Sequence, residues 1–178
     1  AEHLVDILES PSFANRDLKV AAMTALGLVP IDVEPQPLLL PRPPGSPDHR
    51  RHVASRQTQL EYLLESFDID NVRANKDRRK ALVRAHAPRT LARLLTDDLP
   101  PELKREIAER LLRAIGPHSK EPSQVREGAV LALGMIGDAD GDRRSNADRT
   151  DIEIQEALLR VVEDGQPAER RFAVIALS

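Results

Sequence analysis

Val125-Arg-Glu-Gly-Ala-Val-Leu-Ala-Leu-Gly-Met-Ile-Gly137 is the stretch of sequence that decides the fold. Its apolar residues recur at steps of three and four, which places them along one stripe of an amphipathic helix. Alanines on this stripe allow a neighbouring helix to approach closely. Glycine after the stripe favours the left-handed conformation that commonly ends a helix, and we expect it at Gly137 and, in a related stretch, at Gly116.

Related stretches recur along the chain. The C-terminal stretch 169–178 matches the first one at five positions, and Arg170 aligns with Arg126 at an offset of 44 residues. Further copies lie at 18–27 and 104–116. Leucine-rich segments precede several copies, often followed by proline or glycine, and a short helix, a tight turn and a longer helix form one helical hairpin. A series of such hairpins predicts a repeat solenoid.

The stretch 125–137 is similar to the Val-Arg-x-x-Ala-x-x-Ala-Leu-Gly-x-Ile-Gly pattern of bacterial HEAT repeats, in the second helix of each repeat. The resemblance covers 1–29 and 101–178 and is weak over 30–88. It implies an all-α fold, an α-α superhelix of about eight or nine helices. It also implies that one arginine per repeat binds an acidic residue of a neighbouring repeat. Matching arginines and plausible partners are Arg105, Arg126 and Arg170, with Asp97, Asp138 and Asp164.

The expected organisation is a single HEAT-like domain over 1–178, a piece of a longer chain. Its parts are a first hairpin (1–29), a proline-rich irregular insertion (30–55), divergent helices (56–98), a helical pair (99–137), a loop (138–150) and a last, truncated hairpin (151–178). The insertion holds seven prolines and therefore cannot be helical. The segments 102–116 and 122–137 both look like second helices, although only 21 residues separate their matching arginines. One of them must take the first-helix role.

Composition excludes several classes of protein. The chain has no cysteine, which rules out disulfides, thiolate metal sites and a cysteine nucleophile. Aromatic residues make up only 2% of the sequence, so leucine, isoleucine, valine and alanine must form the core. No apolar run reaches the roughly 18 residues that a membrane helix needs. We expect a protein of the bacterial cytoplasm or periplasm, without a membrane span.

The sharpest candidate for a metal site is Asp138-Ala-Asp140-Gly-Asp142, with carboxylates at alternate positions as in a calcium loop. The rest of the pattern fails, since the twelfth position is Arg149 and the glycine comes too early. A solvated loop is therefore the favoured interpretation, and we expect no metal, cofactor or catalytic residue.

The middle of the chain is basic, with 12 Lys/Arg against 6 Asp/Glu over 42–93. A nucleic-acid surface would need aromatic or polar base readers beside this charge, and the densest basic stretch has no aromatic residue. Nucleic-acid binding is therefore disfavoured. The residues we expect to contact a partner are Arg78, Arg79, Lys80, Arg84, Arg110, Arg113, Glu127 and Arg171.

Together these features predict a non-enzymatic protein–protein interaction scaffold within a larger bacterial protein or assembly. Two alternatives stay open. The resemblance also allows a HEAT-like accessory enzyme of the phycobilin lyase type, and the basic middle allows a nucleic-acid backbone binder.

Overall fold

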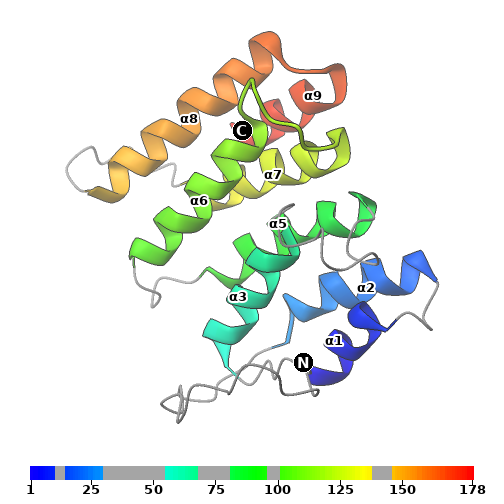
Figure 1. The fold of residues 1–178 in the computed structure, drawn as a ribbon. Helices are drawn as coiled ribbons and strands as arrows, with labels where there is room; N and C mark the ends of the chain where they lie inside the picture. Colours follow the sequence, from blue (N-terminus) through cyan, green and yellow to red (C-terminus); the bar gives the residue numbers. More distant parts are fainter. Residues whose placement is uncertain (11–14, 30–54, 68–80, 96–100, 138–145) are drawn as a thin grey trace.

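The computed structural model describes residues 1–10, 15–29, 55–67, 81–95, 101–137 and 146–178. Within these ranges the backbone forms eight α-helices and no strand, which confirms the predicted all-α class. The helices are α1 (Glu2–Glu9), α2 (Arg16–Leu26), α3 (Arg56–Phe67), α5 (Ala81–Leu94), α6 (Pro101–Ile115), α7 (Ser123–Ile136), α8 (Asn146–Asp164) and α9 (Pro167–Ala176). They follow one another through the molecule in chain order, from α1 and α2 at one end to α8 and α9 at the other (Figure 1).

Local sequence signals explain where several helices begin. The Asn15 side chain caps α2 by accepting hydrogen bonds from the backbone N–H groups of Asp17 and Leu18, at 2.9 and 3.3 Å. At the start of α9, Gln166 and Glu169 form a reciprocal capping box, and a proline occupies the first helical position. These caps fix the point at which the chain turns from one helix into the next.

Consecutive helices pack as pairs: α1 with α2, α3 with α5, α6 with α7, and α8 with α9. We call the members of each pair its first and second helix. The second helices also pack on one another, α2 against α5, α5 against α7, and α7 against α9, so that they form one continuous row. Among the first helices, α6 packs against α8. Each pair therefore buries its apolar residues partly against the next pair.

The two adjacent segments that both resemble second helices take different roles. The earlier one is α6, which packs against α7 and against the first helix α8. The later one is α7, which lies in the row between α5 and α9. The apolar residues of α6, such as Ile107 and Leu111, are fully buried between these neighbours. The sequence motif alone could not separate the two roles, because both kinds of helix present an apolar stripe.

Glycines lie at each contact between successive second helices. A Cβ atom added at any of the three would come within 3.0 Å of the facing helix (Gly27 against Thr90, Gly128 against Ala85, and Gly134 against Ala176). Real Cβ atoms essentially never approach so closely. The close packing of successive second helices therefore requires glycine, which has no side chain, at these positions. The alanine-rich pattern predicted close approach of neighbouring helices in this part of the repeat.

Two local expectations are wrong. Neither Gly116 nor Gly137 adopts a positive φ angle, and Gly137 is extended, with φ −63° and ψ 135°. Its backbone N–H still donates to the Leu133 carbonyl, so α7 ends at a glycine whose own backbone is extended. The predicted loop 138–150 is also too long at its C-terminal boundary, because α8 already begins at Asn146. Arg149 and Glu153, one helical turn apart, form an ion pair there at 3.4 Å.

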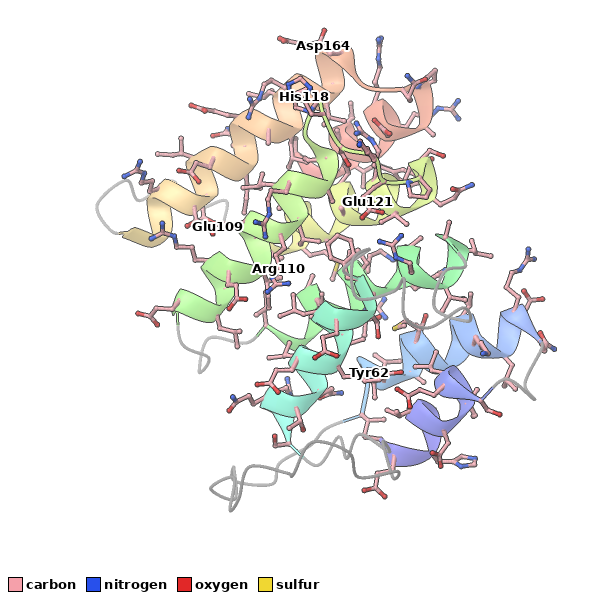
Figure 2. The ribbon with its side chains drawn as sticks, in the orientation of Figure 1. Tyr62, Glu109, Arg110, His118, Glu121 and Asp164 are labelled. Carbon is pink, nitrogen blue, oxygen red and sulfur yellow. The ribbon has the colours of Figure 1, made fainter. Side chains whose placement is uncertain are left out.

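The core is continuous along the row of hairpins. It consists mainly of leucine, isoleucine, valine and alanine, with Tyr62 and Phe67 of α3 as its buried aromatic residues. Tyr62 lies on α3, near the middle of the molecule (Figure 2). None of the described helices is both long and apolar enough to cross a lipid bilayer.

Candidate interaction surface at the end of the helical row

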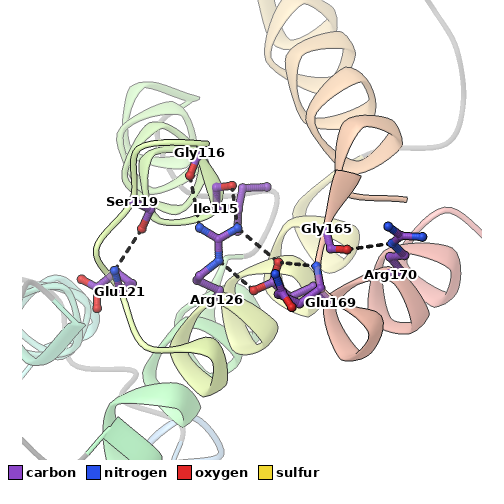
Figure 3. Close-up of polar contacts among 9 residues, drawn as sticks. Ile115, Gly116, Ser119, Glu121, Arg126, Gly165, Glu169 and Arg170 are labelled. Carbon is purple, nitrogen blue, oxygen red and sulfur yellow. Dashed lines mark hydrogen bonds and ion pairs between the residues drawn. The ribbon is translucent and has the colours of Figure 1, made fainter. Parts of the chain in front are cut away.

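A partly buried arginine of α7 connects three helices. Arg126 donates from Nε and Nη2 to the two carboxylate oxygens of Glu169 on α9, at 2.7 and 3.1 Å. Its Nη atoms also donate to the backbone carbonyls of Gly116 and Ile115 at the end of α6, at 3.2 and 3.4 Å (Figure 3). The Glu169 side chain is only 1% exposed. The guanidinium thus joins the end of its own hairpin's first helix to the second helix of the following hairpin.

Arg84 of α5 repeats this arrangement one hairpin earlier. Its Nη2 donates to the Phe67 carbonyl at the end of α3, at 2.7 Å, and to both carboxylate oxygens of Glu121, at 2.9 Å. Glu121 belongs to the segment that joins α6 to α7 (Figure 2). Arg84 is 3% exposed, so this cation is removed from solvent and is compensated by the charge-assisted contact of its Nη2 with both carboxylate oxygens.

Lys19 of α2 occupies the equivalent position in the first hairpin. It is 1% exposed, and its ammonium donates to the carbonyls of Leu8 and Ser10 at the end of α1, at 3.2 and 3.0 Å. The last four carbonyls of a helix lack intrahelical partners and carry the negative end of the helix dipole. A cation at this position of each hairpin therefore satisfies groups that burial would otherwise leave unpaired.

The last member of the series is Arg170 of α9, and its surroundings differ. Its Nε donates to the Gly165 carbonyl at the end of α8, at 2.7 Å, which repeats the backward contact of the other cations (Figure 3). The forward contact is missing, since no carboxylate of the described residues bonds to Arg170. The residue is exposed, whereas Arg84 is buried and the Arg126 side chain is only 18% exposed.

The side of each second helix that faces the next one carries the same three positions, four residues apart. We call this the outward face. In α7 it comprises Arg126, Val130 and Gly134: the first and last contact α9, and Val130 is fully buried between them. The corresponding residues are Lys19 and Met23 of α2 with the C-cap Gly27, Arg84, Pro88 and Ala92 of α5, and Arg170 and Val174 of α9 with Ser178 just beyond its end.

Only the outward face of α9 is open among these four. Met23 of α2 is 3% exposed and Pro88 of α5 is buried, whereas Val174 of α9 is 55% exposed. Ile175 and Leu177, which flank it, are 60% and 37% exposed. An apolar side chain that is covered in three hairpins is thus presented to solvent in the fourth, beside an exposed arginine. This outward face of α9 is the candidate interaction surface.

Among the described residues, one of the three predicted arginines binds an acid of a neighbouring hairpin. Arg126 binds Glu169, an acidic residue that the sequence had not suggested. Asp164 is exposed at the outer end of α8 (Figure 2), and Asp97 and Asp138 lie outside the described residues. Arg105 pairs with Glu109 along the solvent side of α6 instead, because α6 is a first helix.

The residues expected to contact a partner separate into three groups. Arg84 lies in the core, where its guanidinium donates hydrogen bonds to the Phe67 carbonyl and to the Glu121 carboxylate. Arg113 and Arg171 are exposed, while Arg110 and Glu127 are half-buried, and Arg110 pairs with Glu106 at 2.9 Å. The basic stretch Arg78, Arg79 and Lys80 lies outside the described residues, as do Asp138, Asp140 and Asp142 of the calcium candidate. The remaining residues contain no cluster of histidine and carboxylate side chains suited to a metal ion.

Sequence reasoning missed that α5 carries the repeat motif, and the signal was present. Val83-Arg84-x-x-Ala87-x-x-x-Leu91 matches the decisive stretch at an offset of 42 residues. Pro88 obscured it, because a proline within a helix normally argues against one. Here α5 is helical on both sides of Pro88.

His86, which is half-buried in α5, has a displaced pKa. Burial in α5 lowers its pKa from the ordinary value of 6.5, and the neighbouring Arg89 cation lowers it further. The imidazole therefore stays neutral in the folded protein at pH values where an exposed histidine would already be charged. It takes no part in the open face of α9.

Comparison of the chain with protein-family models, with curated proteins and with solved structures gives no match.

Proposed function

We propose that the chain is a non-enzymatic scaffold for protein–protein interaction, built as an α-α superhelix of HEAT-like hairpins within a larger bacterial protein or assembly. The observation that carries the proposal is the repeated connection between second helices. Arg84 with Glu121 and Arg126 with Glu169 join successive hairpins through ion pairs in which the guanidinium bonds to both carboxylate oxygens. A structure that repeats one interface is characteristic of solenoids, in which each unit is stabilised by its neighbours.

Solenoids expose long, chemically regular surfaces, and such surfaces usually bind other macromolecules. This chain offers exposed charged residues on the second helices and on α6, including Arg113 and Arg171. It also exposes three apolar residues close together at the end of α9, namely Val174 and Ile175 of the helix and Leu177, its C-cap residue. Apolar side chains gathered beside charged ones are typical of a protein-binding surface. The phycobilin lyase and nucleic-acid alternatives stay predictions, and no contact of the described residues favours either.

Site-specific photo-crosslinking in the native host would test the proposal. A photoreactive residue would be placed singly at Arg113 on α6, at Arg171 on α9 and at Glu156, an exposed residue of α8. A scaffold should yield the same protein partner from repeated preparations, in near-stoichiometric amount and concentrated at one or two of these positions. Uniformly weak, heterogeneous products at all three positions would refute the scaffold function.

A further inference from the structure

We infer that the side of α5 and α7 that faces solvent is a docking surface for an extended segment of a partner protein. This segment carries an acidic side chain and, about three residues away, an apolar one. We call this side the solvent face, and it consists of Arg89 and Arg93 on α5 and of Leu131 and Met135 on α7. The inference rests on the proposed scaffold function, to which it gives a surface and a class of partner.

The solvent face is the one side of these two helices on which no described helix packs. Each helix packs on its own first helix and on the second helices before and after it in the row. Leu131 and Met135 follow Arg89 and Arg93 by 42 residues, which is the offset between the two helices, so the four residues occupy matching positions. Arg93 and Met135 are exposed, and Arg89 and Leu131 are half-buried.

The exposure of the solvent face does not depend on how far the row continues. Packing of α9 shows what a following hairpin covers, namely the outward face of α7, through Arg126 and Gly134. Met135 is still 49% exposed, although α7 has a second helix on either side. A further hairpin would cover the outward face of α9 in the same way, and it would leave the solvent face of α5 and α7 open.

The charge on α5 indicates an acidic partner. Arg89 and Arg93 lie one helical turn apart, and none of the described carboxylates bonds to either. Like charges at this spacing repel each other. Burial lowers the pKa of the nearby His86, and the Arg89 cation lowers it further, so this imidazole adds no charge at neutral pH. A carboxylate bound to the two guanidinium groups would relieve their repulsion through charge-assisted hydrogen bonds.

The apolar side chains of α7 set the spacing in the partner. Met135 is exposed at the end of the helix, and its flexible thioether adapts to apolar side chains of different shape. The helices α5 and α7 pack directly, and the axes of packed helices lie about 8 to 10 Å apart. An extended chain rises about 3.3 Å per residue, so three residues cover this distance. An apolar residue three positions from the acid therefore reaches Leu131 and Met135.

A nucleic acid is the alternative occupant of a cationic surface, and the solvent face suits it less well. Glu127 lies one turn before Leu131 on the same side of α7, where its carboxylate would repel phosphates. Single-stranded nucleic acids also bind through bases stacked on aromatic side chains, and α5 and α7 contain no phenylalanine, tyrosine or tryptophan. The exposed apolar surface of Met135 has no counterpart in a phosphate backbone. A protein segment therefore fits this face better.

Selection from a random peptide library against the full chain tests the inference. We expect the enriched peptides to share an aspartate or glutamate, with leucine, isoleucine, methionine or phenylalanine about three residues away. Enriched peptides are then synthesised with a fluorescent label, and their affinity for the chain is measured by anisotropy. Enrichment without a shared acidic residue, or no enrichment at all, would overturn the inference.

Substitutions with matched controls locate the binding. Arg93→Glu should weaken binding of an enriched peptide at least about tenfold, because it replaces an attraction by a repulsion. Arg113→Glu should not, although Arg113 is also an exposed arginine in the last turn of its helix, α6. Met135→Gln should weaken binding at least about threefold. Leu159→Gln on α8, at a residue of similar exposure (47%), should not. Unchanged binding by both solvent-face variants would contradict the assignment.

Three measurements identify the other occupants, and each can refute the partner assignment. Binding of a single-stranded DNA oligonucleotide that Arg93→Glu abolishes would assign the face to nucleic acid. A larger fall in the urea midpoint for Arg93→Glu than for Arg113→Glu would show that a segment of the chain itself covers the face. An assembly in light scattering that Arg93→Glu dissociates would assign the face to a second copy. We expect none of these results.

Failure of this inference can be separated from failure of the scaffold function. A host protein crosslinked at Arg113 or Glu156 contacts the first helices α6 or α8, away from the solvent face. Such a crosslink, together with a peptide selection that yields no binder dependent on Arg93, would retain the scaffold and reject this docking surface.

Discussion

Replacing Arg126 by methionine should destabilise the protein far more than replacing an exposed arginine. Methionine keeps part of the side-chain volume but removes both contacts to Glu169 and the bonds to the Ile115 and Gly116 carbonyls. It leaves the Glu169 carboxylate, 1% exposed, without its counter-charge. Removing one partner of a buried ion pair costs about 3 to 5 kcal/mol. For a domain of this size, that loss lowers the thermal midpoint by roughly 6 to 20 °C.

The assay is urea unfolding followed by circular dichroism at 222 nm, with Arg105→Met as the matched control. Arg105 also pairs with a glutamate at 2.9 Å, but its side chain is 70% exposed. The control should therefore cost less than about 1 kcal/mol. The double variant Arg126→Met/Glu169→Gln should recover about 2 kcal/mol of the single-variant loss, because no buried charge then remains uncompensated.

Two results would refute this reasoning. If Arg126→Met cost no more than Arg105→Met, the buried pair would not be what holds α7 and α9 together. If the double variant were as unstable as the sum of the two single variants, Arg126 and Glu169 would act independently. A change in the urea dependence of the unfolding free energy would show instead that the α8–α9 hairpin unfolds separately.

Two further predictions concern the α7–α9 contact and a buried histidine. Gly134→Ala should destabilise the protein by about 1 to 3 kcal/mol in urea unfolding, since the new Cβ would lie 2.4 Å from that of Ala176. Gly116→Ala, whose nearest contact would be 3.4 Å, should change stability less, and equal losses would contradict the close-approach argument. His86 has a lowered folded-state pKa, so the unfolded chain takes up its proton first as the pH falls. Its contribution to stability is therefore complete above pH 6.5 and declines below it. Urea midpoints measured at about pH 8 and about pH 5 should differ less in His86→Gln than in the unaltered chain, and an unchanged difference would exclude this titration.

The helical class and the repeat could be predicted from the sequence because both depend on local periodicity. The spacing of Val125, Ala129 and Leu133 defines an apolar stripe, and all three are fully buried. The structure confirms that both the 102–116 and 122–137 segments are helical. It also shows that Gly134 allows close packing between α7 and α9. The sequence pattern alone does not distinguish this role of a glycine from the termination of a helix.

The partners of the buried cations could not be predicted in the same way, because they depend on which helix faces which. Glu121 and Glu169 lie 37 and 43 residues after the arginines they bind. Sequence proximity to the repeat boundary instead favoured aspartates such as Asp164, which is exposed. The burial of Arg84 could not be predicted either. It belongs to the basic middle of the sequence, and the packing of α3 against α5 places its guanidinium in the core.

The bridge from Arg126 to Glu169 gives the row a polarity. In α5 and α7 the second helix offers its cation toward the C-terminal side of the row, and it receives a carboxylate from that side. The two edges of a hairpin therefore differ chemically, because one carries the cation and the other carries the carboxylate. A hairpin can therefore extend the row only in the direction in which its carboxylate meets the arginine of the hairpin before it.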